Sequence, residues 1–317
     1  MLIQTWKIPE MVKGGLTWLP IVNTWRQRRA ATGGTNSARY CYAVWFRHLV
    51  TLSQYGFRIT GAHVGELGPG DSIGTGLVTL LSGAERYTGL DVVPFSASAN
   101  LLPFFHELVI LYDQREPIPD REEFPFVRPI LPSYDFPAHT VEWPTSAAKI
   151  ALIQESVRNG INSAPLIRYY APWTSSDGVA AGSLDLLFSQ SVLQYVDALE
   201  DTYQAMFTWL KPGGFASHWI GFWAHQFSPY WNGHWAYADW QWRLVRGRRE
   251  LLLNRQPLNV HLHYATKVGF EVLKQEREYA SGGLPVRALS KKSQTFDGED
   301  LQTRGAMVIL RKPQRPD

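Results

Sequence analysis

The chain has 317 residues, of which 45% are hydrophobic and 19% are charged, and its net charge at pH 7 is +3. This length suits one α/β core with insertions, and the composition is that of an ordinary globular protein. The small net charge argues against nucleic acid as a partner, and we interpret the short basic runs at 26–29 and 246–249 as solvated faces. No apolar run reaches the roughly 20 residues of a membrane span.

Cysteine usage and the first residues bear on location. Cys41 is the only cysteine, so an intrachain disulfide is excluded, which suits a reducing compartment. The opening stretch MLIQTWKIPEMVKGG places Lys, Pro and Glu where a secretory signal would need an unbroken apolar centre. We therefore expect a cytoplasmic protein without a membrane span, and its oligomeric state stays unknown.

The first elements along the chain predict a parallel sheet. Apolar residues at helical spacing predict a helix over 37–55, with Arg39 and Arg47 on its other faces. A buried strand, a glycine-rich turn, a helix and a second strand then follow over 62–67, 68–73, 74–84 and 85–93. Strand, turn, helix and strand form a βαβ unit, which implies parallel strands with a right-handed crossover.

An irregular region separates this unit from the rest of the sheet. A helix is expected over 100–114, whereas 115–145 contains seven prolines and little periodicity. Because this stretch also holds several large aromatic residues, we predict an insertion that folds onto the core.

Strand and helix patterns return after residue 163. Strands are predicted over 164–173, 182–190 and 215–222, with an antiparallel pair over 269–279 and 305–312 closing the sheet. A helix is predicted over 196–214, beginning at a cap-like pair formed by Asp197 and Glu200.

The glycine-rich turn after the first strand indicates a small-molecule ligand. A nicotinamide-binding turn has the pattern G-x-G-x-x-G; Gly68 and Gly70 fit it, but Ile73 occupies the third position. Glu66, just before the turn, would be unfavourable beside pyrophosphate and suitable beside an ammonium group. Asp91 lies 21 residues beyond Gly70, where a carboxylate can accept both hydroxyls of a ribose. An ammonium and a ribose together describe S-adenosylmethionine.

Four stretches resemble the successive motifs of class I S-adenosylmethionine-dependent methyltransferases: VGELGPGDSIGTG, YTGLDVV, LDLLFSQSVLQYV and WLKPGGF. The resemblance implies a Rossmann-like α/β fold with a seven-stranded, mostly parallel sheet whose last strand is antiparallel. It also implies that the cofactor lies along the carboxyl ends of the first two strands. We expect an N-terminal helical cap over 1–60 and a methyltransferase domain over 61–317. That domain would carry the insertion at about 94–165 and a Trp-rich acceptor segment at about 218–256.

The resemblance also implies positions for the cofactor. The expected cofactor-binding residues are Arg39, Glu66, Gly68, Pro69, Gly70, Asp71, Ser72, Asp91 and Gln190. Ser72 can cap the helix start, and Gln190 would lie near the sulfonium. Arg39 either pairs with the methionine carboxylate or is a surface charge. For the adenine, Trp173 and Asp177 are candidates, with a purely structural role as the alternative.

Methyl transfer to a hydroxyl requires alignment and removal of a proton. His218 lies at or near the end of the fifth strand and His225 follows on its loop, so either could be the base; the alternative is that each orients loop backbone. Six of the 13 tryptophans lie between Trp219 and Trp242. We favour an acceptor wall over core packing there, because glycines and histidines interrupt the aromatic residues. The expected substrate-binding residues are Trp231, Asn232, His234, Asn254 and Arg255.

Metal binding is not expected. The two imidazoles of HLH at 261–263 would occupy alternate strand positions and need a third ligand, and the chain has no cysteine cluster.

The sequence thus predicts a methyltransferase that acts on a sugar or other small-molecule hydroxyl. More narrowly, stretches such as YAVWFRHL and SHWIGFWAHQ resemble bacterial methyltransferases associated with polysaccharide and glycan biosynthesis. N-methylation of an amino sugar or peptide is the nearest alternative. Two more distant classes stay open at this point: a nicotinamide-dependent oxidoreductase, and a cofactor-binding subunit without catalysis.

Overall fold

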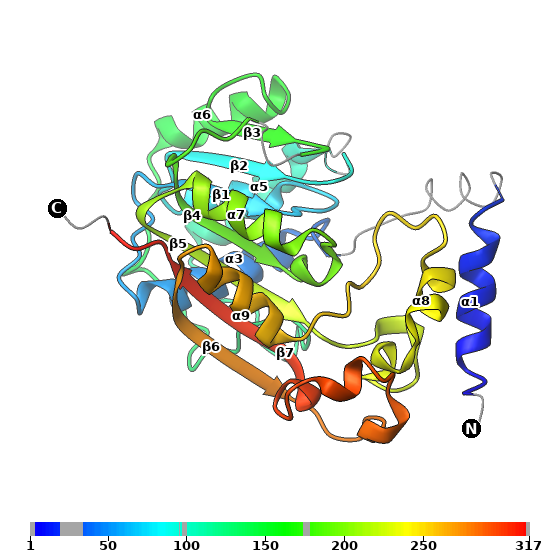
Figure 1. Ribbon diagram of the computed structural model, residues 1–317. Helices are drawn as coiled ribbons and strands as arrows, with labels where there is room; N and C mark the ends of the chain where they lie inside the picture. The colour runs from blue at the N-terminus through cyan, green and yellow to red at the C-terminus, as the bar shows by residue number, and fades with distance from the viewer. Residues whose placement is uncertain (1–3, 20–33, 95, 97–99, 174–177, 315–317) are drawn as a thin grey trace.

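A computed structural model describes residues 4–19, 34–94, 96, 100–173 and 178–314 (Figure 1). Its centre is a seven-stranded sheet in the order β3-β2-β1-β4-β5-β7-β6. β7 is antiparallel to both of its neighbours, and the other pairs are parallel. The strands are β1 (His63–Leu67), β2 (Arg86–Leu90), β3 (Ile167–Tyr170), β4 (Leu184–Gln190), β5 (Leu210–Gly221), β6 (Glu271–Tyr279) and β7 (Thr303–Arg311). The expected α/β fold class is confirmed.

Helices cover both faces of the sheet. One face packs against α3 (Ala38–Ser53), α4 (Gly74–Leu81), α5 (Leu101–Asp113) and α6 (Ala147–Arg158). The other face packs against α7 (Leu199–Trp209) and α9 (Leu258–Lys267). Strand side chains alternate between the two: Val64 joins the first apolar core and Leu67 the second. This layering leaves the carboxyl ends of the parallel strands open to loops.

The predicted βαβ unit is confirmed. β1 pairs in parallel with both β2 and β4, so the glycine-rich turn lies at the middle of the sheet's carboxyl edge. α4 begins at Gly74, directly after this turn. The first strand, the turn and the end of the second strand therefore meet at one place.

The proline-rich insertion folds onto the core, and Arg47 holds it there. Although the helical pattern placed Arg47 away from the apolar face, its side chain is fully buried. Its guanidinium donates to the carbonyls of Val127, Pro119 (2.6 Å) and Asp120 (2.8 Å). Irregular backbone leaves carbonyls without helix or strand partners, and Arg supplies several donors in a fixed geometry. The expectation for Arg47 was therefore wrong.

Two further local predictions were wrong. The expected cap pair of α7 does not form: the helix begins after Ala198 without a side-chain cap, and Asp197 instead accepts from Arg246 at 2.7 Å. The HLH stretch lies in α9 and not in a strand, so His261 is buried while His263 is exposed. Residues two apart on a helix point in different directions, which removes any shared metal site. No group of three potential metal ligands occurs within the described ranges.

Two helices stand apart from the sheet, on the side toward which the parallel strands point (Figure 1). They are α1 (Lys7–Leu16) and α8 (Asp239–Arg246), which pack against each other. α1 thus contacts the Trp-rich segment, whereas α3 packs into the sheet core. Within the described ranges, no helix combines the length and apolarity needed to cross a membrane.

We predict that Arg47→Ala lowers the free energy of unfolding by about 3 kcal/mol, because two buried carbonyls and one part-buried carbonyl lose a charged donor. Urea denaturation measures this loss. Arg39→Ala is the matched control: Arg39 lies on the same helix, but its ion pair with Glu123 is about one-third exposed and should contribute less than about 1 kcal/mol. Equal losses in the two variants would contradict the role given to Arg47.

Candidate active site

The glycine-rich turn is tied to the end of β2 by its backbone. The Gly68 amide donates to the Leu90 carbonyl at 2.7 Å. Gly68 and Gly70 both have left-handed φ angles, 63° and 77°, that favour glycine. A Cβ on Gly68 would also lie 2.6 Å from Cγ2 of Val192, which follows β4. Because Gly68 has no side chain, the segments that follow β1, β2 and β4 can come close together at this turn.

Glu66 is a buried carboxyl beside this turn. Its side chain is 3% exposed, and its Oε2 accepts a hydrogen bond from the Tyr87 hydroxyl at 2.5 Å. Among the described residues it forms no ion pair. Burial therefore raises the pKa of Glu66 to about 8, and the nearby Asp91 carboxylate adds to the shift. A cation placed here would stabilise the ionised form.

Asp91 lies at the end of β2 and faces the turn. Its Oδ1 accepts from the amides of Val92 (2.7 Å) and Val93 (3.5 Å), and its Oδ2 accepts from the Gly70 amide (3.2 Å). Burial raises the pKa of Asp91, while these amide bonds oppose the rise. A carboxylate offers about four acceptor positions, so Asp91 retains capacity for a hydroxyl donor.

The other predicted turn residues lie at the same place. Ser72 Oγ accepts from the Gly74 amide at 3.0 Å, as expected of a residue at a helix start, and bonds to the backbone of Thr35. Pro69 packs beside Gly89 of β2: its Cγ is 3.3 Å from where a Cβ would stand. Asp71 completes the turn, and its charge acts on Asp91.

Gln190 ends β4 and belongs to a buried polar network. Its Oε1 lies 3.1 Å from Nε2 of His48, whose Nδ1 lies 2.7 Å from the Ser217 hydroxyl. Burial lowers the pKa of His48 to about 4, so the imidazole is neutral near pH 7. His48 was not singled out in the sequence, since a lone histidine in a helix carries no motif.

The structure gives contacts for Arg39 and for one of the two adenine candidates, Trp173. The Arg39 guanidinium forms two 2.6 Å hydrogen bonds to Glu123 of the insertion, so in this structure an acidic partner already holds it. Trp173 donates its amide to the Asp91 carbonyl at 2.9 Å, and its ring packs edge-on against Trp209. Trp173 is thus close to the turn in space. Asp177 lies outside the described residues.

Gln194 is a site residue that the sequence pattern did not single out. It lies in the short helix η2 (Leu193–Tyr195) after β4, is 2% exposed, and neither its Oε1 nor its Nε2 has a partner within the described part of the chain. A Cβ on Gly221, at the end of β5, would be 3.6 Å from this Nε2. Buried amides are ordinarily hydrogen-bonded, so Gln194 is a candidate to bond a ligand at the ends of β4 and β5. Gln194 lies within the stretch LDLLFSQSVLQYV, and the resemblance of this stretch to a methyltransferase motif was the sequence signal that could have identified it.

His225 and Tyr195 meet between the ends of β4 and β5. His225 is in η3 (His225–Phe227) with a left-handed φ of 47°. Its Nδ1 accepts from Nε1 of Trp223 at 2.8 Å, and its Nε2 lies 3.3 Å from the Tyr195 hydroxyl. His225 is an exposed residue, but partial desolvation of its ring by the surrounding protein, with the charge of Arg304, lowers its pKa to about 4. Backbone strain of this kind is common at functional sites.

His218 occupies a different environment. It lies within β5, three residues before the strand's end, and has no exposed surface. Its Nδ1 lies 2.8 Å from the Ser189 hydroxyl, and burial lowers its pKa to about 3. This position favours His225 over His218 as a group that an acceptor can reach.

The predicted substrate-binding residues mostly bind the protein's own backbone. Asn254 Nδ2 donates to the carbonyls of Leu193 and Val196, both at 2.8 Å, which fixes the segment that carries Gln194. Arg255 donates to the Tyr237 carbonyl and to Asp239.

Asn232 pairs twice with the backbone of Leu284, and His234 is buried. Trp235 and Trp242 are buried as well, so much of the Trp-rich segment is core and not the wall we favoured.

Trp231 and Asn232 do line a pocket of about 300 Å³, formed with loops that adjoin β6 and β7. The Trp231 indole Nε1 is buried and has no partner among the described residues. Trp231 thus gives this pocket an aromatic side chain, whereas its Nε1 is enclosed by the protein.

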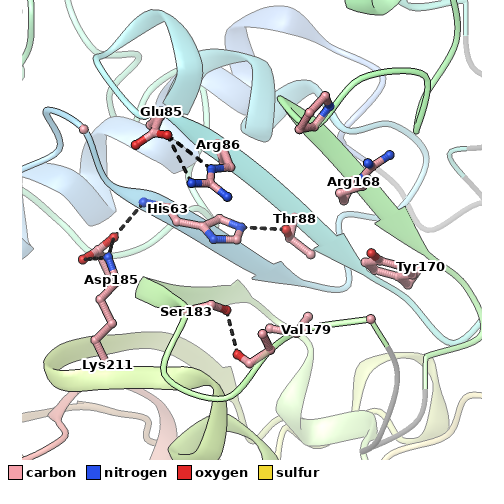
Figure 2. A pocket seen from close by; sticks show the side chains of 14 residues that line it. His63, Glu85, Arg86, Thr88, Arg168, Tyr170, Val179, Ser183, Asp185 and Lys211 are labelled. Atoms are coloured by element: carbon pink, nitrogen blue, oxygen red, sulfur yellow. Dashed lines mark hydrogen bonds and ion pairs between the residues drawn. The ribbon is translucent and has the colours of Figure 1, made fainter.

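A larger pocket, of about 490 Å³, opens at the other end of the sheet (Figure 2). It lies over the starts of β1, β4 and β5 and extends across β2 to Arg168 and Tyr170 of β3, where the described part of the β3–β4 connection contains no helix. Four of its charged residues form ion pairs: Lys211 bonds both oxygens of Asp185, and Arg86 bonds Glu85. Arg168 donates to the Asn162 carbonyl at 2.7 Å. His63 bonds Thr88 at 2.9 Å. Ligands of open α/β sheets bind at the carboxyl ends, so this pocket is not the candidate site.

We predict that Glu66→Gln changes the pH dependence of stability. Because the folded pKa of about 8 exceeds the ordinary value of 4.5, the native protein binds more protons than the unfolded chain between these values. The free energy of unfolding should therefore fall as pH rises from about 4.5 to about 8. Glu66→Gln should abolish this decrease in the free energy of unfolding. Above pH 8 the variant should therefore be more stable than the wild type by a few kcal/mol.

Denaturant titrations at several pH values test this expectation. Glu85→Gln is the control, because Glu85 is exposed and should leave the pH profile unchanged. Parallel profiles for the wild type and Glu66→Gln would contradict the raised pKa.

No protein-family model and no curated protein matches this chain. Among solved structures, an S-adenosylmethionine-dependent methyltransferase from Mesorhizobium loti is similar, with 13% identity, a TM-score of 0.42, and 83% of this chain and 96% of that protein covered. A geranyl diphosphate C-methyltransferase from Streptomyces coelicolor is 11% identical over 83% of this chain and 77% of its own, with a TM-score of 0.44.

A third similar structure is the phosphoethanolamine N-methyltransferase 2 of Haemonchus contortus in complex with S-adenosyl-L-methionine. It is 14% identical, with a TM-score of 0.44, and the match covers 85% of this chain and 53% of that protein. The chain thus spans about half the length of that enzyme. At these identities and TM-scores, the likeness carries no function over to this chain.

Proposed function

We propose that this chain is an S-adenosylmethionine-dependent methyltransferase that binds its cofactor along the carboxyl ends of β1 and β2. The observation that carries the proposal is Glu66, a buried carboxyl with a raised pKa and no cationic partner among the described residues. Burying a carboxylate is costly unless an opposite charge compensates it. The ammonium group of a methionine tail supplies that charge, and Asp91 retains an acceptor position for a ribose hydroxyl.

The same groups disfavour a dinucleotide. A pyrophosphate at the start of α4 would stand close to the Asp91 carboxylate, which repels it, and would offer no positive charge to the buried Glu66 carboxyl. The Gly74 amide at this helix start is already satisfied by Ser72. Ile73, at the third fingerprint position, is fully buried and cannot provide the close approach that glycine permits.

The chain's own residues would bind and align the reactants. When bound, the cofactor supplies a methyl group activated by its sulfonium. Glu66 would hold the amino group, and the bare backbone at Gly68 and Gly70 admits the methionine tail. Gln190 and Gln194 lie at the end of β4 and just after it, and their amides would orient the groups around the transferred methyl. Alignment is the main requirement of an in-line displacement.

His225 is better placed than His218 to act as the base that removes the proton of a hydroxyl acceptor. Because Nδ1 accepts from the Trp223 indole, the neutral ring carries its proton on Nε2, next to the Tyr195 hydroxyl. An acceptor hydroxyl that takes the place of the indole N–H meets the lone pair of Nδ1. The lowered pKa of His225 keeps this lone pair free of a proton near pH 7.

The acceptor we propose is a sugar or another small-molecule hydroxyl. The resemblance to glycan-associated bacterial enzymes supports this choice, as does the pocket that Trp231 lines, since aromatic rings stack on sugars. An amine acceptor is the alternative, because an amine needs less help in losing its proton.

The division into a cap over 1–60 and a catalytic domain over 61–317 stays a prediction, as does the cytoplasmic location.

Cofactor binding tests the proposal through the amino-acid tail. We predict that S-adenosylhomocysteine binds at least tenfold more tightly than 5′-methylthioadenosine, which lacks the ammonium, and that Glu66→Gln removes most of this difference. Isothermal titration calorimetry measures both ligands with both proteins, and Glu85→Gln serves as the control. Tight binding of NAD, or an undiminished difference in Glu66→Gln, would refute the assignment.

The rate of methyl transfer tests the base. With a hydroxyl acceptor found by screening sugars and amines with labelled S-adenosylmethionine, His225→Gln should lower kcat by about 10²–10⁴-fold. Since the pKa of His225 is about 4, the wild-type kcat should not fall between pH 8 and pH 6, as it would for an ordinary imidazole. His263→Gln, which changes an exposed histidine on α9, should behave as the wild type. An unchanged kcat in His225→Gln would exclude this base.

A further inference from the structure

We propose that the paired helices α1 and α8 form a docking surface for an anionic lipid bilayer. This surface, called the α1–α8 surface here, is defined by residues 4–19 and 238–250. It holds seven of the fifteen large apolar side chains that are exposed in the described residues, each 43–59% accessible to solvent. They are Ile8, Val12, Leu16, Trp18, Leu19, Trp240 and Leu244. Such a concentration of exposed apolar groups marks an interaction site.

The apolar residues of α1 form one stripe. Ile8, Val12 and Leu16 are four residues apart, so they lie on the same side of the helix. The opposite side is the one that packs on the protein, because Gly14 and Lys7 are buried there. α1 is therefore amphipathic in an unusual sense: its inner side is polar or small, and its outer side is apolar.

The contacts between the helices show that this arrangement is built in. A Cβ on Gly14 would stand 2.0 Å from the Leu244 carbonyl oxygen, so only glycine allows the two helices to approach this closely. The buried Lys7 Nζ donates to the Ala236 carbonyl and lies 5.2 Å from the Tyr237 ring centroid. These contacts use the inner side of α1 and leave its apolar stripe outward.

Basic residues accompany the apolar side chains. Without the buried Lys7, the α1–α8 surface contains five Lys and Arg residues and three Asp and Glu residues, and Lys13 pairs with Glu10. Lys13, Arg243 and Arg248 are exposed, and the Arg248 guanidinium lies 5.0 Å from the Trp18 ring centroid. Tryptophans with neighbouring cations are the side chains that settle at a bilayer interface carrying anionic headgroups.

Charge complementarity favours a bilayer over a second copy of the chain. A symmetric dimer through the α1–α8 surface would bring two net positive faces together, which disfavours association. Anionic headgroups instead neutralise Arg243 and Arg248 while the apolar residues enter the interface. Because α1 and α8 lie on the side toward which the parallel strands point (Figure 1), docking would turn the carboxyl edge of the sheet toward the membrane. This inference does not depend on the proposed function.

Co-sedimentation of the full chain with lipid vesicles tests the docking surface. We expect binding to phosphatidylcholine vesicles that contain phosphatidylglycerol at 0.1 M salt, and loss of most binding at 1 M salt or without the anionic lipid. Arg243→Gln combined with Arg248→Gln should weaken binding roughly thirtyfold. Val12→Ser combined with Trp240→Ser should weaken it by a similar factor, because two interfacial side chains are lost.

The matched control is Ile110→Ser combined with Leu152→Ser, which removes two equally exposed apolar side chains from α5 and α6 and should leave vesicle binding unchanged. If the Val12 and Trp240 variant does not fold, the arginine variant still decides the question. No binding to anionic vesicles at 0.1 M salt, or equal loss in the control, would overturn the proposal. So would a dimer, detected by light scattering, that the Val12 and Trp240 substitutions dissociate.

Discussion

The buried carboxyl of Glu66 is the constraint on which the proposed site depends. It lies on β1, an interior strand of the sheet, where it is bonded to Tyr87 and held away from water, so its pKa rises to about 8. A charge in such a place must be neutralised by a proton or by a cation. The unliganded protein uses a proton, and the proposed cofactor offers an ammonium. One carboxyl thus links the stability of the fold to the choice of ligand.

The rest of the structure places other groups around that carboxyl. Parallel pairing of β1 with β2 and β4 brings the glycine turn, Asp91 and the segment after β4 to one edge. Asn254 then fixes that segment through two carbonyls, which holds the Gln194 amide, without a partner in the described part of the chain, near the end of β5. Because each of these groups comes from a different strand end, the site forms only when the sheet is complete. This is how an open α/β sheet ordinarily positions a ligand.

The sequence predicted the fold well, whereas the roles that it assigns to site residues stay predictions. The glycine turn, the acid after the second strand and the alternating elements depend on local patterns, and the structure confirms their places. Arg47 was misplaced because a helical pattern treats every charge as solvated, whereas an irregular insertion needs buried donors for its carbonyls. Asn232, Asn254 and Arg255 were predicted to bind substrate, but they bond backbone in loops distant in sequence. Such pairings have no local signature, and for the same reason Gln194 and the contact of Tyr195 with His225 were missed.

Titration of the Glu66 carboxyl is the most direct test of the proposal that this buried charge is neutralised by a proton in the free protein and by the cofactor's ammonium in the complex. Carbon NMR of glutamate-labelled protein, with the signal assigned from Glu66→Gln, reports the pKa of this group with and without S-adenosylhomocysteine. We predict a pKa near 8 in the free protein and a clear fall when the ligand's ammonium is bound. An ordinary pKa near 4.5 in the free protein, or a raised pKa that the ligand leaves unchanged, would contradict the role given to Glu66.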